Sequence, residues 1–258
     1  MKLDRLYVEK PWGRTSLPPM FGPPPAKRIG EVWFTGGGDD IPLLVKYLFT
    51  SERLSIQVHP NDEQARARGL ARGKSECWYI LDAEPGATLG LGLKHDCSPE
   101  QLRSAALDGS IEQMIEWRPV RRHDFFLVPP GTIHAIGGGI SLLEFQQNSD
   151  VTYRLYDYGR PRELHLDDAV TVALRTPYPP ELMQHLDDCT PITLADTQQF
   201  TLVHTREDVM RDRARWAIPL DGAVRTRDEV AIAGECLLLA PGEPLQPGDA
   251  RMLIGAKA

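Results

Sequence analysis

The stretch LSIQVHP, Leu54 to Pro60, alternates apolar and polar side chains as a half-buried β-strand does. Successive strand side chains point to opposite faces, so Gln57 and His59 project from the same face. Polar groups on the inward face of an apolar strand need a partner, and a divalent cation would satisfy both. The stretch therefore predicts a β fold with a metal site in its interior.

Two later segments supply the rest of this predicted metal site. Glu76 stands in KSECWY, and His134 stands in PPGTIHAIG, where Pro129 and Gly131 predict a tight turn before the strand of the histidine. Each motif alone has an ordinary interpretation, because a lone histidine is more often a satisfied core residue than a ligand. Together the two windows are typical of metal-binding double-stranded β-helix barrels. Imidazole, carboxylate and amide oxygen suit zinc or another first-row divalent metal.

The rest of the chain also predicts mainly β structure, because 22 Gly and 22 Pro punctuate 258 residues into short apolar runs. Expected strands are 31–35, 43–50, 55–59, 76–83, 87–91, 124–128, 134–136, 141–147, 152–155, 200–204, 216–220, 229–232, 236–240 and 251–254. Cap residues and apolar spacing predict short helices over 98–106, 110–117 and 166–174. The Pro-rich segment 17–25 predicts a surface loop.

The stretch TPYPP, 176–180, is the best candidate linker and divides the chain into two predicted domains. Residues 1–175 would form the metal-binding catalytic domain. Residues 176–258 would form a smaller β unit without metal ligands, a decayed second copy of the first.

Charge and cysteine content limit the partners and the compartment. A net charge of −7 and a pI near 5.5 argue against a nucleic-acid binder. The first residues do not resemble a signal peptide, and no apolar run reaches the length of a membrane span. The scattered Cys77, Cys97, Cys189 and Cys236 indicate reduced thiols in a cytoplasmic protein, with Cys77 buried and facing away from Glu76.

Several charged residues stand in apolar surroundings. Glu144, followed by Arg154, is consistent with a buried ion pair or with a general base beside an arginine clamp. Lys46, within IPLLVKYLF, either extends its ammonium group to solvent or holds a phosphate. Lys74 would share the strand face of the predicted ligand two residues later if that strand begins early enough.

Eight ordered motifs over about residues 8–175 carry a family resemblance. They are KPWG (10–13), GEVW (30–33), LVKYL (44–48), LSIQVHPND (54–62), GKSECWYIL (73–81), VPPGTIHAIG (128–137), LLEFQQNSDVTYRLYDYGR (142–160) and RELHLDDA (162–169). They resemble type I mannose-6-phosphate isomerase, and in particular its short bacterial form. The chain departs from the short forms at Arg14, which follows KPWG where they continue with Gly.

The resemblance implies a cupin-type double-stranded β-helix, or jelly roll, with a few short helices and a second, smaller degenerate cupin-like unit. It implies a zinc-dependent aldose–ketose isomerase that interconverts mannose 6-phosphate and fructose 6-phosphate through an enediol, with a small sugar phosphate as its partner. By motif, the metal ligands are Gln57, His59, Glu76 and His134, the catalytic residues are Arg154, Glu144 and Lys74, and the substrate-binding or phosphate-binding residues are Lys46, Ser55 and Glu31. Glu144 is the leading candidate for the base, and Lys74 is its rival.

Other functions remain as alternatives at this stage. A metal-dependent cupin dioxygenase would prefer three histidines, or two with a carboxylate, where this chain supplies Gln57. A non-catalytic sugar-binding or regulatory cupin would not need Glu144, Arg154 and Lys74. An isomerase with another preferred sugar is the third alternative. The sequence leaves open a monomer or a small homo-oligomer.

Overall fold

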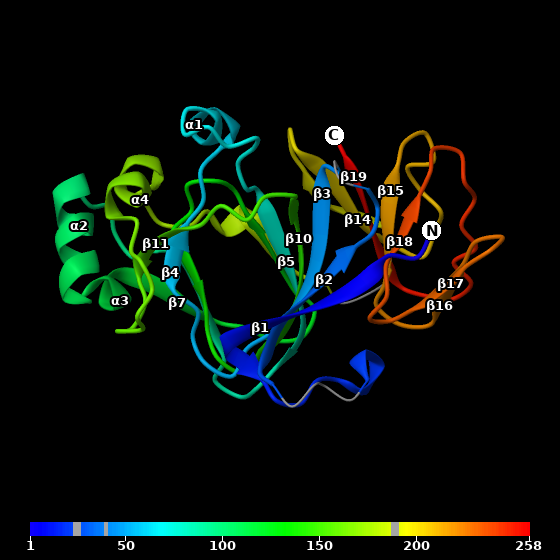
Figure 1. Cartoon of the computed structure of the whole chain (residues 1–258), viewed down its shortest axis with the longest axis horizontal. Helices are drawn as coiled ribbons and strands as arrows, with labels where there is room; N and C mark the ends of the chain where they lie inside the picture. Colours follow the sequence, from blue (N-terminus) through cyan, green and yellow to red (C-terminus); the bar gives the residue numbers. More distant parts are fainter. Residues whose placement is uncertain (23–26, 39–40, 187–190) are drawn as a thin grey trace.

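Two antiparallel sheets face each other, and a third sheet covers the outer face of the larger one (Figure 1). The computed structural model describes residues 1–22, 27–38, 41–186 and 191–258. Residues 23–25 of the Pro-rich segment and Cys189 lie outside the described residues. In the part of the chain so described, no helix is long and apolar enough to cross a membrane.

The larger sheet contains seven strands, in the order β1 (Asp4–Arg14), β2 (Ile29–Thr35), β3 (Leu43–Phe49), β10 (Ile140–Gln147), β5 (Glu76–Ala83), β8 (Asp124–Val128) and β12 (Met183–His185). The opposing sheet contains β11 (Tyr153–Tyr156), β4 (Ile56–Val58), β9 (His134–Ile136), β6 (Thr88–Leu93) and β7 (Ile115–Pro119). From β3 to β6, and again from β8 to β11, successive strands alternate between the two sheets. This alternation is the jelly roll that the sequence predicts.

The third sheet contains β13 (Ile192–Asp196), β14 (Phe200–Thr205), β19 (Met252–Lys257), β15 (Arg215–Pro219) and β18 (Leu237–Leu239). A hairpin of β16 (Ala223–Arg225) and β17 (Val230–Ile232) lies beside it. The helices are α1 (Asp62–Arg66), α2 (Pro99–Asp108), α3 (Ile111–Met114) and α4 (Leu166–Val172), with 3-10 turns at Pro19–Phe21 and Pro180–Leu182. Helices α2, α3 and α4 cover the outer face of the five-stranded sheet of β4 (Figure 1).

Strand alternation in β10 separates a packing face from a functional face. Phe145 points to the third sheet, where its ring centroid lies 5.2 Å from that of Phe200 and 6.3 Å from that of Trp216. Gly255 permits this close approach, because a Cβ there would lie 2.3 Å from Cζ of Phe145. Cys77 packs in the same core, so its predicted burial on the face opposite Glu76 is confirmed.

One predicted helix needs correction, and several elements were not predicted. The helix predicted over 110–117 ends at Met114, and the chain continues as β7, where Ile115 and Trp117 cover Gly90 of β6. Strands β1, β12, β13 and β16 were not predicted. Neither was the short helix α1, although Asn61 and Gln64 form a capping box at its start.

The proposed linker 176–180 packs against the jelly roll. The N–H of Leu93 donates to the carbonyl of Thr176 over 3.1 Å, and Tyr178 is buried. The chain then enters β12, which pairs with β8 at the edge of the seven-stranded sheet. The division of the chain near residue 175 stays a prediction.

Candidate functional site

Three predicted metal ligands converge between the facing sheets. His59 directly follows β4, Glu76 begins β5 and His134 begins β9, and one ligand atom of each lies within 4.8 Å of the others. Glu76 Oε2 is 3.6 Å from His59 Nε2, and Glu76 Oε1 is 3.4 Å from His134 Nε2. All three side chains are buried, and within the described ranges they form the one such cluster.

Backbone contacts orient the two histidines. His134 Nδ1 lies 2.9 Å from the carbonyl of Thr132, which can only accept, so the ring proton belongs on Nδ1 and the Nε2 lone pair faces Glu76. Gly131 turns the chain before this strand with φ of 87°, a left-handed conformation that favours glycine. Its N–H donates to the carbonyl of His59 over 2.8 Å, so the two histidine segments are tied together.

Gln57 lies beside the cluster. It pairs in register with His134 across β4 and β9, and its Nε2 is 3.2 Å from His134 Nε2. The hydroxyl of Ser55 donates to Gln57 Oε1 over 3.1 Å. A 180° rotation of the amide would exchange the positions of its oxygen and nitrogen. Oε1 would then be a fourth metal ligand, and the Ser55 hydroxyl would accept a hydrogen bond from Nε2.

The buried atoms of this cluster fit a divalent cation. Among the described atoms, Glu76 Oε1 has no hydrogen-bond partner, which is costly for a buried polar group, while Glu76 Oε2 lies 2.9 Å from the ammonium of Lys74. Burial lowers the pKa of His59 to about 3 and also lowers that of His134, so both rings are neutral and can ligate. Burial raises the pKa of Glu76, but Lys74 and His59 outweigh it and hold that pKa well below its usual value. Two neutral imidazoles and a carboxylate are a zinc-type donor set.

Four side chains form a row across the inner face of the large sheet. The register aligns Trp33 of β2, Lys46 of β3, Glu144 of β10 and Trp78 of β5. Lys46 Nζ lies 3.5 Å from Glu144 Oε1 and 4.4 Å from the ring centroid of Trp33. The indole N–H of Trp78 donates to Glu144 Oε2 over 3.0 Å. Lys46 is therefore buried and does not extend to solvent, and Glu144 is paired with Lys46 instead of Arg154.

Two charged groups in this region have shifted acidity. Burial and the charge of Glu76 raise the pKa of Glu144, although Lys74 and Lys46 oppose this. Burial lowers the pKa of Lys74, but Glu76 and Glu144 outweigh it and raise that pKa. Lys74 precedes β5, yet its Nζ lies 2.9 Å from Glu76 Oε2 and 3.3 Å from His59 Nε2. Glu144 is thus protonated more easily than an ordinary glutamate, and Lys74 is an ammonium.

A cavity beside the metal cluster collects the remaining predicted residues. Its lining includes Glu31, Lys46, Ser55, Gln57, Lys74, Glu144 and Arg154. Glu31 accepts from the indole N–H of Trp33 over 2.6 Å and lies 3.4 Å from the ammonium of Lys10. Ser55 touches Gln57 directly, as described above. The structure therefore places seven of the predicted site residues around one space, and two of them, Gln57 and Lys74, also contact the metal cluster.

Several residues of this cavity were not predicted as site residues, namely Lys10, Trp12, Asp150, Thr152 and Arg162. Lys10 and Arg162 stand in the motifs KPWG and RELHLDDA, but nothing in those motifs showed that they face the site. Asp157 holds Arg162 through two contacts of 2.6 Å, to Nε and NH2.

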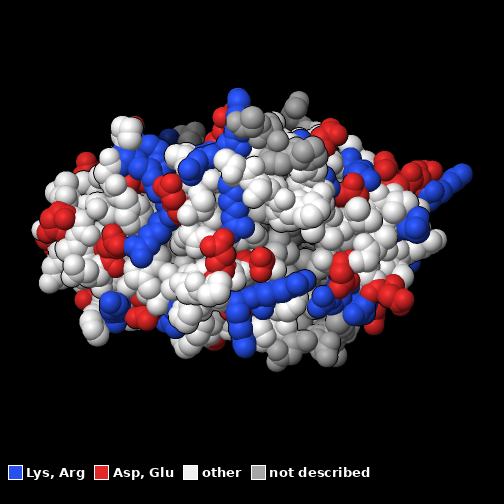
Figure 2. Space-filling view, turned by 90° about the horizontal axis from the view of Figure 1, so that it is seen from below, with Lys and Arg blue, Asp and Glu red and all other residues white. Residues whose placement is uncertain are grey.

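The cavity is locally rich in cations although the chain is acidic. Lys10, Lys46, Lys74, Arg154 and Arg162 line it, against Glu31, Glu144 and Asp150. On the outer surface, one face of the molecule shows both signs of charge interspersed (Figure 2). Because the net charge of the chain is −7, an anionic ligand would be attracted by this cavity and not by the overall charge.

Comparisons with known proteins agree with a site for a metal and an anionic ligand. No protein-family model matches the chain. A mannose-6-phosphate isomerase of Bacillus subtilis is 35% identical over 241 residues, which cover 76% of this chain and 76% of that protein. One of Streptococcus mutans is 44% identical over 138 residues, 51% of this chain and 43% of that protein.

Solved structures share the fold over nearly the whole chain. The crystal structure of the mannose 6-phosphate isomerase from Bacillus subtilis has a TM-score of 0.78 at 27% identity and covers 99% of this chain and 98% of that one. A zinc-bound mannose 6-phosphate isomerase has a TM-score of 0.76 at 14% identity, with coverage of 99% and 98%, which shows a common fold.

Proposed function

The chain belongs to the mannose-6-phosphate isomerase family, and on that premise we propose that it interconverts mannose 6-phosphate and fructose 6-phosphate as a metal-dependent aldose–ketose isomerase. The observation that carries this proposal is the convergence of buried His59, Glu76 and His134 beside a cavity lined by cations. A metal held by this cluster would assist the isomerisation, and the cations would bind the anionic sugar phosphate.

His59, Glu76, His134 and the rotated amide of Gln57 would hold the metal, with Ser55 fixing that amide. Zinc bound there would supply Lewis-acid polarisation of the oxygens on the reacting carbons of the sugar. Another divalent metal that accepts nitrogen and oxygen donors is the alternative.

Glu144 is the proposed base. The reaction takes a proton from C2 of the open-chain aldose and returns it to C1 of the enediol. A carboxylate suits this task when its pKa is raised toward the working pH, and burial raises the pKa of Glu144. Trp78 and Lys46 would aim its oxygens, since each contacts one of them. The ion pair of Lys74 with Glu76 favours a role for Lys74 as a cation or proton donor.

Arg154 and Arg162 are the proposed anchors for the anionic groups of the substrate. Both line the cavity, and Asp157 orients the guanidinium of Arg162 in advance. Lys46 is largely neutralised by Glu144, so its expected contribution to phosphate binding is smaller. Binding energy from the phosphate would hold C1 and C2 in place for proton transfer.

We assign this activity to residues 1–175 and a supporting role to 176–258, since the residues proposed for the site all precede residue 163. The free thiols of Cys77 and Cys236 support a cytoplasmic location.

A coupled isomerase assay on mannose 6-phosphate tests the proposal. We expect activity that disappears on chelation and returns when zinc is restored, with one metal bound per chain. Activity that survives complete metal removal would overturn the metal role. Stable metal binding without turnover of mannose 6-phosphate would overturn the assigned reaction.

A further inference from the structure

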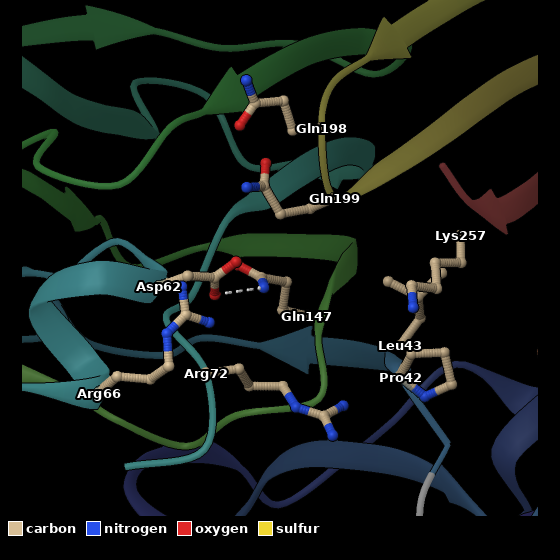
Figure 3. A pocket seen from close by; sticks show the side chains of 9 residues that line it. All are labelled: Pro42, Leu43, Asp62, Arg66, Arg72, Gln147, Gln198, Gln199 and Lys257. Atoms are coloured by element: carbon tan, nitrogen blue, oxygen red, sulfur yellow. Dashed lines mark hydrogen bonds between the residues drawn. The ribbon is translucent and has the colours of Figure 1, made fainter. Parts of the chain in front are cut away.

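A second polar cleft lies apart from the metal cluster (Figure 3). It has a volume of about 410 Å³ and is bounded by α1, the ends of β3 and β10, the turn between β13 and β14, and β19. None of the residues assigned to the metal centre or to the catalytic cavity lines it. The isomerase chemistry therefore leaves this cleft without a role.

Cations and amide groups dominate its lining. Arg66 and Lys257 are exposed on opposite sides of the cleft (Figure 3). No ion pair of either within 4.0 Å is found in the described ranges, but the charge of Arg66 acts on Asp62. Asp62 supplies the one carboxylate of the lining, and it already accepts from the N–H of Gly73 over 2.8 Å and from Gln147 Nε2 over 2.9 Å. Gln198 and Gln199 add side-chain amides from the neighbouring turn.

One side chain connects this cleft with the metal centre. Gln147 is 7% exposed, and while its Nε2 donates to Asp62, its Oε1 accepts from the N–H of Ser75 over 2.9 Å. The N–H of Gln147 also donates to the carbonyl of Ser75 over 3.0 Å. Ser75 stands between Lys74 and the metal ligand Glu76. Hydrogen bonds through Gln147 therefore link Asp62, at the start of α1, with the backbone that carries two active-site residues.

We propose that this cleft binds a small phosphorylated molecule, and that Gln147 couples its occupancy to the isomerase site. Phosphate oxygens accept hydrogen bonds from a guanidinium, an ammonium and amide N–H groups, which are the donors found here. The volume suits a sugar phosphate or a mononucleotide, which share this phosphate chemistry. The coupling rests on the proposed isomerase function, whereas the binding does not.

Titration calorimetry on the full chain tests the binding. The probes are inorganic phosphate, glucose 1-phosphate and ADP, so that a sugar phosphate is distinguished from a nucleotide. In the double variant Arg66→Glu/Lys257→Glu, we expect the Kd of the preferred probe to rise at least about tenfold, because two charge-assisted contacts become repulsive. The control Lys94→Glu/Arg227→Glu makes the same charge change at exposed residues elsewhere and should change the Kd less than about twofold.

Three results would overturn the binding site. They are no saturable binding of any probe up to about 10 mM, an unchanged Kd in the Arg66/Lys257 variant, or an equal loss of affinity in the control. The last result would assign the binding to overall charge.

Kinetics test the coupling separately. The bound probe should change KM or kcat for mannose 6-phosphate at least about twofold in the native chain. Gln147→Met should keep probe binding, because its Nε2 is already donated to Asp62, but should lose the kinetic effect. Asp62→Ala removes the other end of the connection and the one carboxylate of the lining, so it should bind the probe at least as tightly and also lose the kinetic effect. An effect that persists in either variant, or binding without any kinetic effect, would refute the coupling. A chain that binds the probe but never isomerises mannose 6-phosphate would refute the proposed function and leave the cleft intact.

Discussion

Replacing Lys46 with methionine would isolate the buried ion pair in the large sheet. Lys46 Nζ lies 3.5 Å from Glu144 Oε1, and the two residues are 3% and 4% exposed. Methionine keeps most of the apolar stem over Trp33 but removes the ion pair of Glu144, so that of these two lysines only Lys74 still acts on the carboxylate. Removing one partner of a buried pair costs about 3–5 kcal/mol of unfolding free energy, so we expect a loss in this range at neutral pH.

The loss should depend on pH, because protonation of Glu144 relieves it. Burial and Glu76 already raise the pKa of Glu144, and removing Lys46 raises it further. When the pKa of a carboxyl group is higher in the folded than in the unfolded chain, its ionised form destabilises the fold. This cost has its full size at pH values above the folded-state pKa. This cost vanishes as the pH falls toward the unfolded value of about 4.3. Lys46→Met should therefore lose more stability at about pH 8 than at about pH 5.5.

Urea unfolding of the native chain, Lys46→Met, Glu144→Gln and the double variant would measure these free energies. The double variant should regain about 2 kcal/mol relative to Lys46→Met, because it no longer buries an unpaired charge. Lys27→Met, which removes an exposed partner of Glu9, is the matched control and should lose less than about 1 kcal/mol. A loss below about 1 kcal/mol for Lys46→Met, or the same loss at both pH values, would refute this account of the pair.

Four further outcomes are expected. His134→Ala should lose its bound metal and at least about a hundredfold in activity, measured by metal analysis and the coupled assay, and retention of both would remove it from the ligand set. Arg154→Lys should reduce kcat/KM by about tenfold or more, because an ammonium cannot replace the planar fork, and near-native kinetics would contradict its anchoring role. Trp78→Phe removes a donor to the Glu144 carboxylate, so the acid limb of the kcat/KM profile should move up by about one pH unit, and an unmoved limb would exclude Glu144 as the base. Burial lowers the pKa of His59 to about 3, from about 6.5 in the unfolded chain, so the unfolded chain binds a proton at higher pH than the folded chain does. The metal-free protein should therefore lose stability as the pH falls from about 6.5 to about 3. When the free energy of unfolding is measured with urea at several pH values, it should depend less steeply on pH in His59→Asn than in the native chain. An identical pH dependence would contradict the assignment of this effect to His59.

Local patterns were sufficient for many strands. The observed bounds of Glu76–Ala83, Asp124–Val128 and His134–Ile136 are those predicted, because alternation and turn residues mark them within the sequence. The prediction failed over 110–117, since apolar residues at helical spacing also suit a short helix followed by a strand. Strand β1 was missed because many of its side chains are partly exposed, and its extended form depends on pairing with β2.

The prediction of the site from the sequence was limited in the same way. The ligand types in their two windows predicted a metal cluster, and His59, Glu76 and His134 do converge. The partner of Lys46 could not be read from the sequence, because the register of β3 against β10 creates the contact with Glu144. The position of Arg162 in the cavity and the second polar cleft are formed by segments that only the tertiary fold brings together, so no local motif could indicate them.

Strand β12 gives the last third of the chain a role beyond its own fold. Met183–His185 occupies the outer edge of β8, and Phe200 and Trp216 cover Phe145 on the back of the same sheet. A fragment cut after Arg175 would keep every residue of the proposed metal centre, yet it would expose a bare strand edge and a patch of aromatic surface. Such edges recruit other chains, so the fragment should aggregate. The last third of the chain therefore protects the large sheet, although it holds no residue of the proposed metal centre.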